Sequence, residues 1–277
     1  MNKFAIVSDQ CSGLSSSDVI GKNIYFVKNP IVIEGQTFYD LSISQLVEAQ
    51  KACKKITTSM PNIGETIELI EKLLVDHQKI FLFSIPKYLS GFFNSISMMV
   101  SQHPLKDRIR IVNISALAYP LEAVLLHISN NFNDVDSVDK YIDLLEKEFD
   151  FSCILCPNNL KYLAMGGRVP NSIASLANLL KIVALIEFNT KESKLVDKVR
   201  LHKKAYQKAM NIIFEKSNNI DVEYFILKNN IDDEILLDIV NSFSLLTGKK
   251  ITVREIPPLI LAHTGYQSLG FGYHTKL

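Results

Sequence analysis

The sequence contains no tryptophan and only four cysteines, and few of its 30 basic residues are arginines. Because arginine is scarce, each one is a candidate for a specific contact. Long apolar runs are also missing, since each is interrupted before the roughly 18–20 residues of a membrane-spanning helix. The chain starts with only four consecutive apolar residues, Phe4 to Val7, fewer than the core of a signal peptide. We therefore expect a cytoplasmic protein without a transmembrane segment.

A strong charge of either sign is absent as well. Lys plus Arg is 30 and Asp plus Glu is 29, which gives a formal net charge of +1. A protein dedicated to nucleic acid needs a basic surface, so nucleic acid is not an expected partner. A hydrophobic content of 47% and a charged content of 21% are typical of a folded globular chain, and 277 residues suffice for two small domains.

The four cysteines show no pattern of a metal site or a disulfide framework. Cys11 and Cys53 are isolated, and Cys153 and Cys156 lie in an apolar run typical of a buried strand. Two strand residues three apart point to opposite faces, which suits neither a shared metal ion nor a disulfide. A phosphate-binding P-loop, a Gly-x-Ser-x-Gly nucleophile elbow and a His-Glu-x-x-His motif are also missing. We therefore expect packed thiols, no metal and no cofactor.

Apolar strands and helices alternate in the first half of the chain. Strands are predicted over 3–7, 24–27, 79–83 and 109–114, with a hairpin over 30–39 that turns at Glu34-Gly35. Helices are predicted over 43–51, 64–75, 95–100 and 138–149, with another after 114. Continuous apolar strands separated by helices indicate a parallel sheet covered by helices on both faces.

The alternation restarts near residue 149, where we place a boundary between two domains, 1–149 and 150–277. Further strands are predicted over 151–156, 182–188, 222–227 and 251–256, and further helices over 158–164, 172–180, 203–217 and 233–243. The predicted fold is therefore α/β with two α/β lobes. Ligands bind beyond the carboxyl ends of parallel strands, where small polar residues such as Ser8, Asp9 and Ser84 fall. We expect a cleft edged with hydroxyls between the lobes.

Two short segments place hydroxyl groups at predicted helix starts. In Thr58-Ser59-Met60-Pro61, proline fixes the chain just before a helix, so hydroxyls and backbone amides meet the positive end of the helix dipole. Leu89-Ser90-Gly91 offers a hydroxyl between an apolar strand and the next helix. Both segments suit an anion, and both also fit ordinary helix caps.

Two further segments carry a cation and a histidine. Gly166-Gly167-Arg168 joins a flexible loop to a forked cation suited to carboxylate or phosphate, although Gly166 can simply end a helix. His263-Thr264-Gly265 follows an apolar run. His263 can be a ligand or a hydrogen-bonded core residue, and on this segment alone the core interpretation is favoured.

Together the four segments resemble the motifs of the DegV family, bacterial proteins that bind fatty acids. The family's Thr-Ser-x-Pro-x-x-Gly-Glu is matched by 58–65, its Leu-Ser-Gly by 89–91, its Gly-Gly-Arg by 166–168 and its His-Thr-Gly by 263–265. The resemblance runs from Ala5 to Gly270. Each motif is weak alone, and their order and spacing across the chain make the match specific.

The resemblance implies a DegV-like fold in which one acyl chain is buried between two lobes and within the first. Residues 1–149 would then hold the acyl-chain pocket, and residues 150–277 would close the cleft. The resemblance also implies that Thr58 and Ser90 hydrogen-bond the carboxylate of the fatty acid.

Four more residues complete the ligand-binding set that the resemblance implies. His263 and Arg168 match family positions at or near the head group, and Ser59 and Gly91 adjoin the two hydroxyls within the matched motifs. In low-GC Gram-positive bacteria such a protein presents a long-chain fatty acid to the catalytic subunit of a fatty acid kinase. That partner binds ATP and makes acyl phosphate. The resemblance therefore implies a lipid-binding carrier subunit that is not itself an enzyme.

Two other functions stay open at the level of sequence. Ser90 and His263 are residue types that a serine-dependent acyl hydrolase or transferase uses, although the nucleophile elbow is missing. A relative of this fold could also bind a small phosphorylated metabolite, a reading that rests on fold analogy alone.

Overall fold

The computed structural model describes residues 3–167, 182–218 and 220–277, which form two compact units. The first unit comprises the chain up to Pro30 and Ser59–Phe149, and the second comprises Ile31–Thr58 and Asp150–Lys276. The division expected from sequence, 1–149 and 150–277, differs from this grouping in residues 31–58. The difference arises because this segment packs against helices that follow residue 150, as described below.

The first unit is built on a four-stranded sheet in the order β2-β1-β6-β7, and all of its strand pairs are parallel. Its strands are β1 (Phe4–Asp9), β2 (Ile24–Val27), β6 (Lys79–Phe83) and β7 (Ile109–Ile111). Every residue of β1 is buried, as expected for a strand with both faces covered. The predicted parallel sheet is confirmed.

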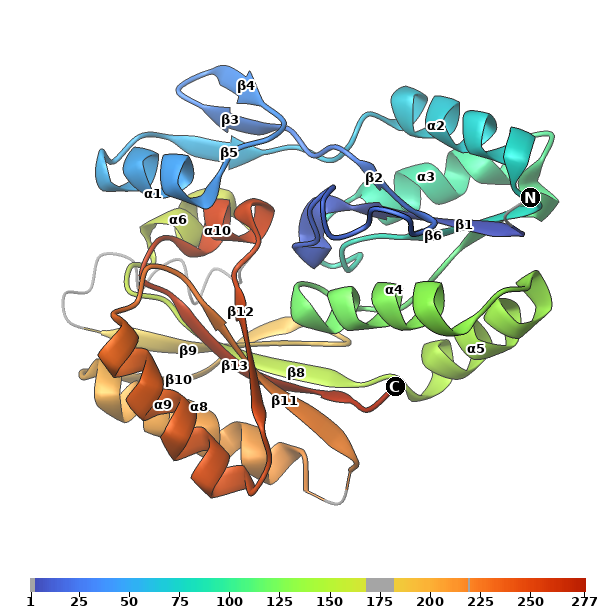
Figure 1. Ribbon diagram of the computed structural model, residues 1–277. Coiled ribbons are helices and arrows are strands. Elements are labelled where there is room, and N and C mark those ends of the chain that lie inside the picture. The colour runs from blue at the N-terminus through green and yellow to red at the C-terminus, as the bar shows by residue number, and fades with distance from the viewer. Residues whose placement is uncertain (1–2, 168–181, 219) are drawn as a thin grey trace. The chain divides into compact units, whose positions relative to one another are not determined.

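Helices cover both faces of this sheet (Figure 1). α2 (Ile63–Asp76) and α3 (Phe92–Ser101) lie on one face, and α4 (Tyr119–Asn131) and α5 (Val135–Glu148) lie on the other. On α2, Ile70, Leu73 and Leu74 are buried at helical spacing and pack against the apolar side chains of β1 and β6. Short 3₁₀ turns occupy Gln10–Ser12 and Lys106–Arg108.

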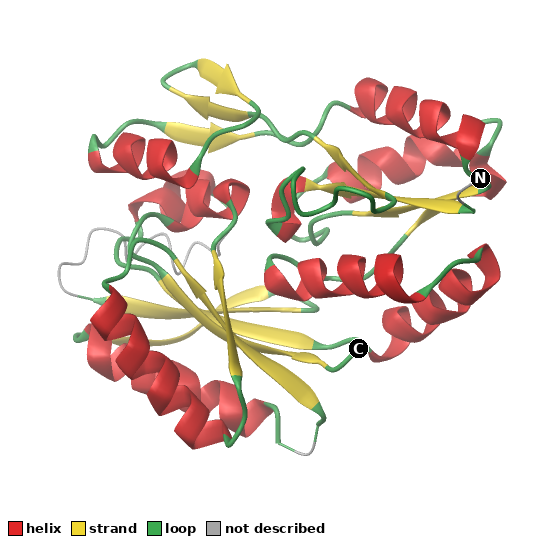
Figure 2. Cartoon of the chain, viewed as in Figure 1, coloured by secondary structure: helices red, strands yellow, loops and turns green. Residues whose placement is uncertain are grey.

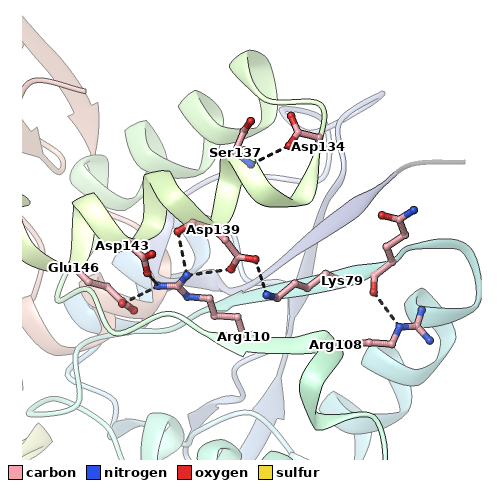
Figure 3. Close-up of polar contacts among 9 residues, drawn as sticks. Lys79, Arg108, Arg110, Asp134, Ser137, Asp139, Asp143 and Glu146 are labelled. Carbon is pink, nitrogen blue, oxygen red and sulfur yellow. Dashed lines mark hydrogen bonds and ion pairs between the residues drawn. The ribbon is translucent and has the colours of Figure 1, made fainter.

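A network of ion pairs fastens α5 to the sheet (Figure 3). Arg110 of β7 reaches Asp139, Asp143 and Glu146 at 3.0, 2.7 and 2.9 Å, and Lys79 of β6 reaches Asp139 at 2.6 Å. The three carboxylates come from one side of α5 because they are spaced three to four residues apart. The network therefore ties α5 to the middle of β7 and to the start of β6.

The second unit contains a six-stranded mixed sheet in the order β10-β9-β8-β13-β11-β12. Its strands are β8 (Phe151–Cys156), β9 (Val183–Asn189), β10 (Ser193–Val199), β11 (Val222–Lys228), β12 (Ile251–Glu255) and β13 (Leu269–Thr275). Only β11 and β12 pair in parallel. α8 (His202–Lys216) and α9 (Asp233–Thr247) pack against one face and bury a large apolar core with it.

The strands predicted from sequence do not include β13, which contains two glycines. It runs antiparallel to both neighbours, β8 and β11, in the middle of the sheet. An ideal Cβ on Gly272 would stand 2.3 Å from Cζ of Phe225. The glycine is therefore required by the ring that packs over it, and a weak strand former occupies a central strand.

A smaller, three-stranded antiparallel sheet completes the second unit (Figure 2). It contains β3 (Ile31–Ile33), β4 (Gln36–Phe38) and β5 (Ile56–Thr58). Two helices, α6 (Lys161–Gly166) and α10 (Pro258–Thr264), contact β5, and α1 (Ile43–Lys51) contacts α10. Glu34 and Gly35 have φ of 49° and 84°, which confirms the predicted hairpin turn. Thr58 of the predicted Thr58–Pro61 segment belongs to β5, and the apolar run before His263 forms α10.

Candidate functional site

The site begins with a contact between two residues that are 205 positions apart in sequence. Thr58 ends β5, and His263 lies in the last turn of α10. Thr58 Oγ1 and His263 Nε2 are 2.7 Å apart, a short hydrogen bond between two half-buried side chains. The second unit thus brings together two of the residues that the sequence predicts for the head group.

Each of these residues is held by its own backbone element. Thr58 pairs with Ile31 across β5 and β3, so its side chain has a fixed direction from the strand. α10 starts with Pro258 in its first turn, where proline is well tolerated, and ends at Gly265, whose φ is 78°. A glycine at that left-handed position allows the chain to leave the helix directly after the turn that carries His263.

The imidazole of His263 packs directly on the backbone of Gly166. An ideal Cβ on Gly166 would lie 2.3 Å from His263 Nδ1 and 3.1 Å from Cε1. No real side chain fits there, so glycine is needed for close approach rather than only to end α6. The next residue, Gly167, ends α6 with a φ of 63°. The two glycines therefore have different roles: Gly166, which the sequence suggested could simply end the helix, makes room for the imidazole, and Gly167 takes the left-handed position after the helix.

The hydrogen bond between Thr58 and His263 gives the pair a defined chemistry. If Nε2 carries a proton, it donates to Thr58 Oγ1, and the hydroxyl hydrogen of Thr58 can be directed to an anion. If the ring is protonated on both nitrogens, it adds a positive charge beside that hydroxyl. Either state suits a carboxylate. In the third state Nε2 is unprotonated and accepts from the Thr58 hydroxyl, which then has no hydrogen to donate to an anion.

Three of the predicted ligand-binding residues belong to the first unit. Ser90 is half-buried, and its Oγ accepts a hydrogen bond of 3.2 Å from the backbone N–H of Phe92 at the start of α3. Gly91 is the N-cap residue of α3. Ser59 is exposed, and its N–H donates to the carbonyl of Pro30 at 3.0 Å. Arg168 lies outside the described residues, as does the helix predicted over 172–180.

Asp9 supports the segment that leads to Ser90. It is fully buried at the end of β1, and its two carboxylate oxygens accept from the N–H of Cys11 at 3.1 Å and of Ile85 at 2.8 Å. Burial raises the pKa of Asp9 above its ordinary value, although these hydrogen bonds oppose the shift. The sequence predicts Asp9 as a polar residue at the sheet edge, but it does not predict the hydrogen bond from Ile85 to Asp9 that fixes the segment after β6.

Three of the four cysteines, Cys11, Cys153 and Cys156, are buried thiols as expected, whereas Cys53 is exposed. Cys153 and Cys156 are buried in β8, and burial raises the pKa of Cys153 to about 12 and raises that of Cys156 as well. Such thiols stay protonated and are poor ligands or nucleophiles. Across residues 3–167, 182–218 and 220–277, no three His, Cys, Asp or Glu side chains are grouped so that they could hold a metal ion. No helix in the described part of the chain is long and apolar enough to cross a membrane.

Comparison with known proteins places these features in a family. Residues 3–276 match the profile of the DegV family, which is described as a family of uncharacterised proteins. A DegV domain-containing protein of Mycoplasmopsis pulmonis is 26% identical over 268 residues, which are 95% of this chain and 92% of that protein.

Solved structures share the fold. A fatty acid binding DegV family protein from Streptococcus agalactiae matches with a TM-score of 0.81 at 22% identity, covering 100% of both chains. The Fatty Acid Kinase (Fak) B3 protein of Streptococcus pneumoniae, loaded with linoleic acid, matches with a TM-score of 0.78 at 18% identity over 99% of this chain and 100% of that one. Since the family profile spans almost every residue, this chain belongs to the DegV family.

Proposed function

We propose that this protein binds a long-chain fatty acid and presents its carboxylate to a separate, ATP-binding fatty acid kinase. The observation that carries the proposal is the 2.7 Å contact between Thr58 and His263. These residues come from distant parts of the chain, and both match family positions at the head group. The fatty acid binding of the Streptococcus agalactiae protein and the linoleic acid in the Streptococcus pneumoniae protein support the ligand class.

In this proposal the acyl chain supplies the affinity and the polar residues supply the orientation. Burying one CH₂ contributes about 0.8 kcal/mol, so a tail of about 16 carbons gains roughly 12 kcal/mol before ordering costs. The hydroxyls of Thr58 and Ser90, with His263, hold the carboxylate through hydrogen bonds. Ser59 and Gly91 directly follow the two residues that carry these hydroxyls, and residues 1–149 hold the acyl-chain pocket.

The carboxylate has to stay reachable, because it is the group that would attack a phosphoryl donor. A carboxylate held by hydroxyls and an imidazole keeps its charge and its nucleophilic lone pairs, as phosphoryl transfer requires. The protein would then act as a carrier subunit rather than as an enzyme, with fatty acid as its ligand and no cofactor of its own. The relation of the chain to the Fak B3 protein is the basis for proposing the kinase as partner.

Mass spectrometry of the ligand that copurifies with the protein tests the ligand class directly. A long-chain fatty acid is the expected result, and a polar phosphorylated metabolite in its place would contradict the proposal. A serine-reactive probe that labels the wild-type protein but not Ser90→Ala would instead favour an acyl hydrolase.

Titration with linoleic acid tests the head-group assignment. Thr58→Ala removes a hydrogen bond to a charged acceptor, worth about 1.5–3 kcal/mol, so affinity should fall roughly tenfold or more. Thr57→Ala is the matched control, because Thr57 is the preceding residue of β5 and its side chain points to the opposite face. Equal affinity of Thr58→Ala and the control would remove Thr58 from the site.

The proposed partnership is tested with a fatty acid kinase catalytic subunit and ATP. We propose that Arg168 serves the transfer step more than ligand binding, because a forked guanidinium suits phosphate as well as carboxylate. Arg168→Ala should therefore reduce acyl phosphate formation more than it reduces linoleic acid affinity. Equal losses in both measurements would place Arg168 in the head-group site alone.

A further inference from the structure

A buried chain of hydrogen bonds links three helices around His263. The hydroxyl of Tyr162 in α6 donates to the backbone carbonyl of Gln50 in α1 at 2.9 Å. The side-chain Nε2 of Gln50 donates to the carbonyl of Leu261 in α10 at 2.8 Å. Tyr162 and Gln50 are 3% and 1% exposed, so neither bond competes with solvent.

The chain ends at the turn that carries His263. The carbonyl of Leu261 also accepts the N–H of Gly265 at 3.0 Å, the bond that closes α10. Gln50 therefore holds this closing turn from outside the helix. The ring of Tyr162 lies against the same turn, since an ideal Cβ on Gly265 would be 3.3 Å from Tyr162 Cδ2.

Tyr162 also fixes the surface on which the imidazole lies. It stands four residues before Gly166, one turn away on the same side of α6. By bonding to Gln50 it ties α6 to α1, and Gln50 ties α1 to α10. Both α10, which carries His263, and α6, which carries Gly166 beneath the imidazole, are thus hydrogen-bonded to Gln50 near the end of α1.

The side-chain amide of Gln50 is not explained by its contribution to the stability of the fold. Within the described part of the chain its Oε1 is buried without a hydrogen-bond partner, and an unsatisfied buried acceptor is unfavourable. An apolar side chain at this position would avoid that penalty. The position is better explained by the bond that its Nε2 makes to the turn of His263.

We propose that Tyr162 and Gln50 are positioning residues that set the orientation of the His263 imidazole toward Thr58. The proposal rests on the function proposed above only for its consequence in fatty acid binding. The hydroxyl of Tyr162 is suited to this role, because burial raises its pKa and the group keeps its proton at neutral pH.

The experiment compares Tyr162→Phe and Gln50→Leu with a matched control, Tyr224→Phe. Tyr224 is also buried in the second unit and shares a hydrogen bond of 2.5 Å with Ser217 Oγ, away from α10. Each variant is examined by the ring ¹H–¹³C and ¹⁵N signals of His263 in the ligand-free protein, by thermal unfolding, and by linoleic acid titration.

We expect both test variants to change the chemical shifts and tautomer ratio of His263 and to weaken linoleic acid binding about threefold to tenfold. Tyr224→Phe should lower thermal stability similarly and leave both readouts as in wild type. If Gln50→Leu does not fold, Tyr162→Phe carries the test, because it removes a single oxygen atom.

Unchanged His263 signals in Tyr162→Phe and Gln50→Leu would overturn the proposal, and so would equal changes in Tyr224→Phe. Failure of the proposed function gives a different pattern. In that case His263→Gln binds linoleic acid like wild type, whereas the His263 signals of the ligand-free variants still report whether Tyr162 and Gln50 position the ring.

Discussion

Gly166→Ala is predicted to displace His263 by adding one methyl group beneath its ring. The new Cβ would lie 2.3 Å from Nδ1, about 1 Å closer than ordinary van der Waals contact. The ring cannot simply slide away, because on its other side Nε2 is already 2.7 Å from Thr58 Oγ1. The imidazole therefore has to rotate out of this arrangement, and the hydrogen bond to Thr58 is lost.

The size of the effect follows from these two consequences. Overpacking of this kind lowers stability by about 1–3 kcal/mol. Loss of one oriented hydrogen bond to a carboxylate is worth about 1.5–3 kcal/mol, which weakens linoleic acid binding by roughly 10- to 150-fold. Calorimetric titration measures the affinity, and the ring signals of His263 report its displacement independently of any ligand.

Gly248→Ala is the control for lost stability. Gly248 ends α9 in the same unit with a φ of 66°, and a Cβ there meets nothing within 4 Å. Alanine at this left-handed position is strained by about 1–2 kcal/mol without touching the site. The reasoning is refuted if Gly166→Ala binds linoleic acid as tightly as Gly248→Ala and keeps the His263 signals of wild type.

Two further predictions concern pH. A carboxylate bound beside His263 favours the protonated ring, so binding should take up a fraction of a proton near neutral pH, and affinity should weaken as pH rises. Calorimetry in buffers of different ionisation enthalpy measures this proton uptake, and His263→Gln should abolish it. Burial opposes ionisation of Glu187, but hydrogen bonds from Lys216 and Ser152 outweigh it and lower its pKa below the ordinary 4.5. This group therefore stabilises the fold above about pH 4.5 and loses that contribution as pH falls through the lowered pKa. Urea unfolding from pH 7 to pH 3 should show a shallower loss of stability in Lys216→Met, and identical slopes would contradict the assignment.

Much of the fold could be predicted because local pattern and tertiary role agree. The buried strands of the parallel sheet are continuous apolar runs, and the helices that cover them have apolar residues at helical spacing. β13 escaped prediction because Gly270 and Gly272 lower its strand propensity. Both glycines lie under neighbouring side chains, among them Cys153 and Phe225, a requirement that exists only once the sheet is assembled.

The candidate site was predictable as a set of residues but not as a geometry. Motif positions indicated Thr58 and His263 separately, and on its own segment His263 was better explained as a core residue. Their contact depends on how residues 31–58 pack. Gln50 and Tyr162 had no signal at all, since an amide in an amphipathic helix and a tyrosine in a short one are usually surface or packing residues.

The grouping of residues 31–58 with the second unit explains why neither half of the sequence contains the site. β5 and α1 come from this early segment, whereas α6 and α10 follow residue 150. Thr58 and Gln50 therefore meet His263 and Leu261 only after contacts that span more than 200 residues have formed. Closing such long loops is entropically unfavourable, so these contacts depend on the packing of the whole unit rather than on local structure. The hydroxyl of Thr58 and the imidazole of His263 are thus a pair created by the tertiary fold, and a perturbation of α1 or α6 should reach the ligand through that pair.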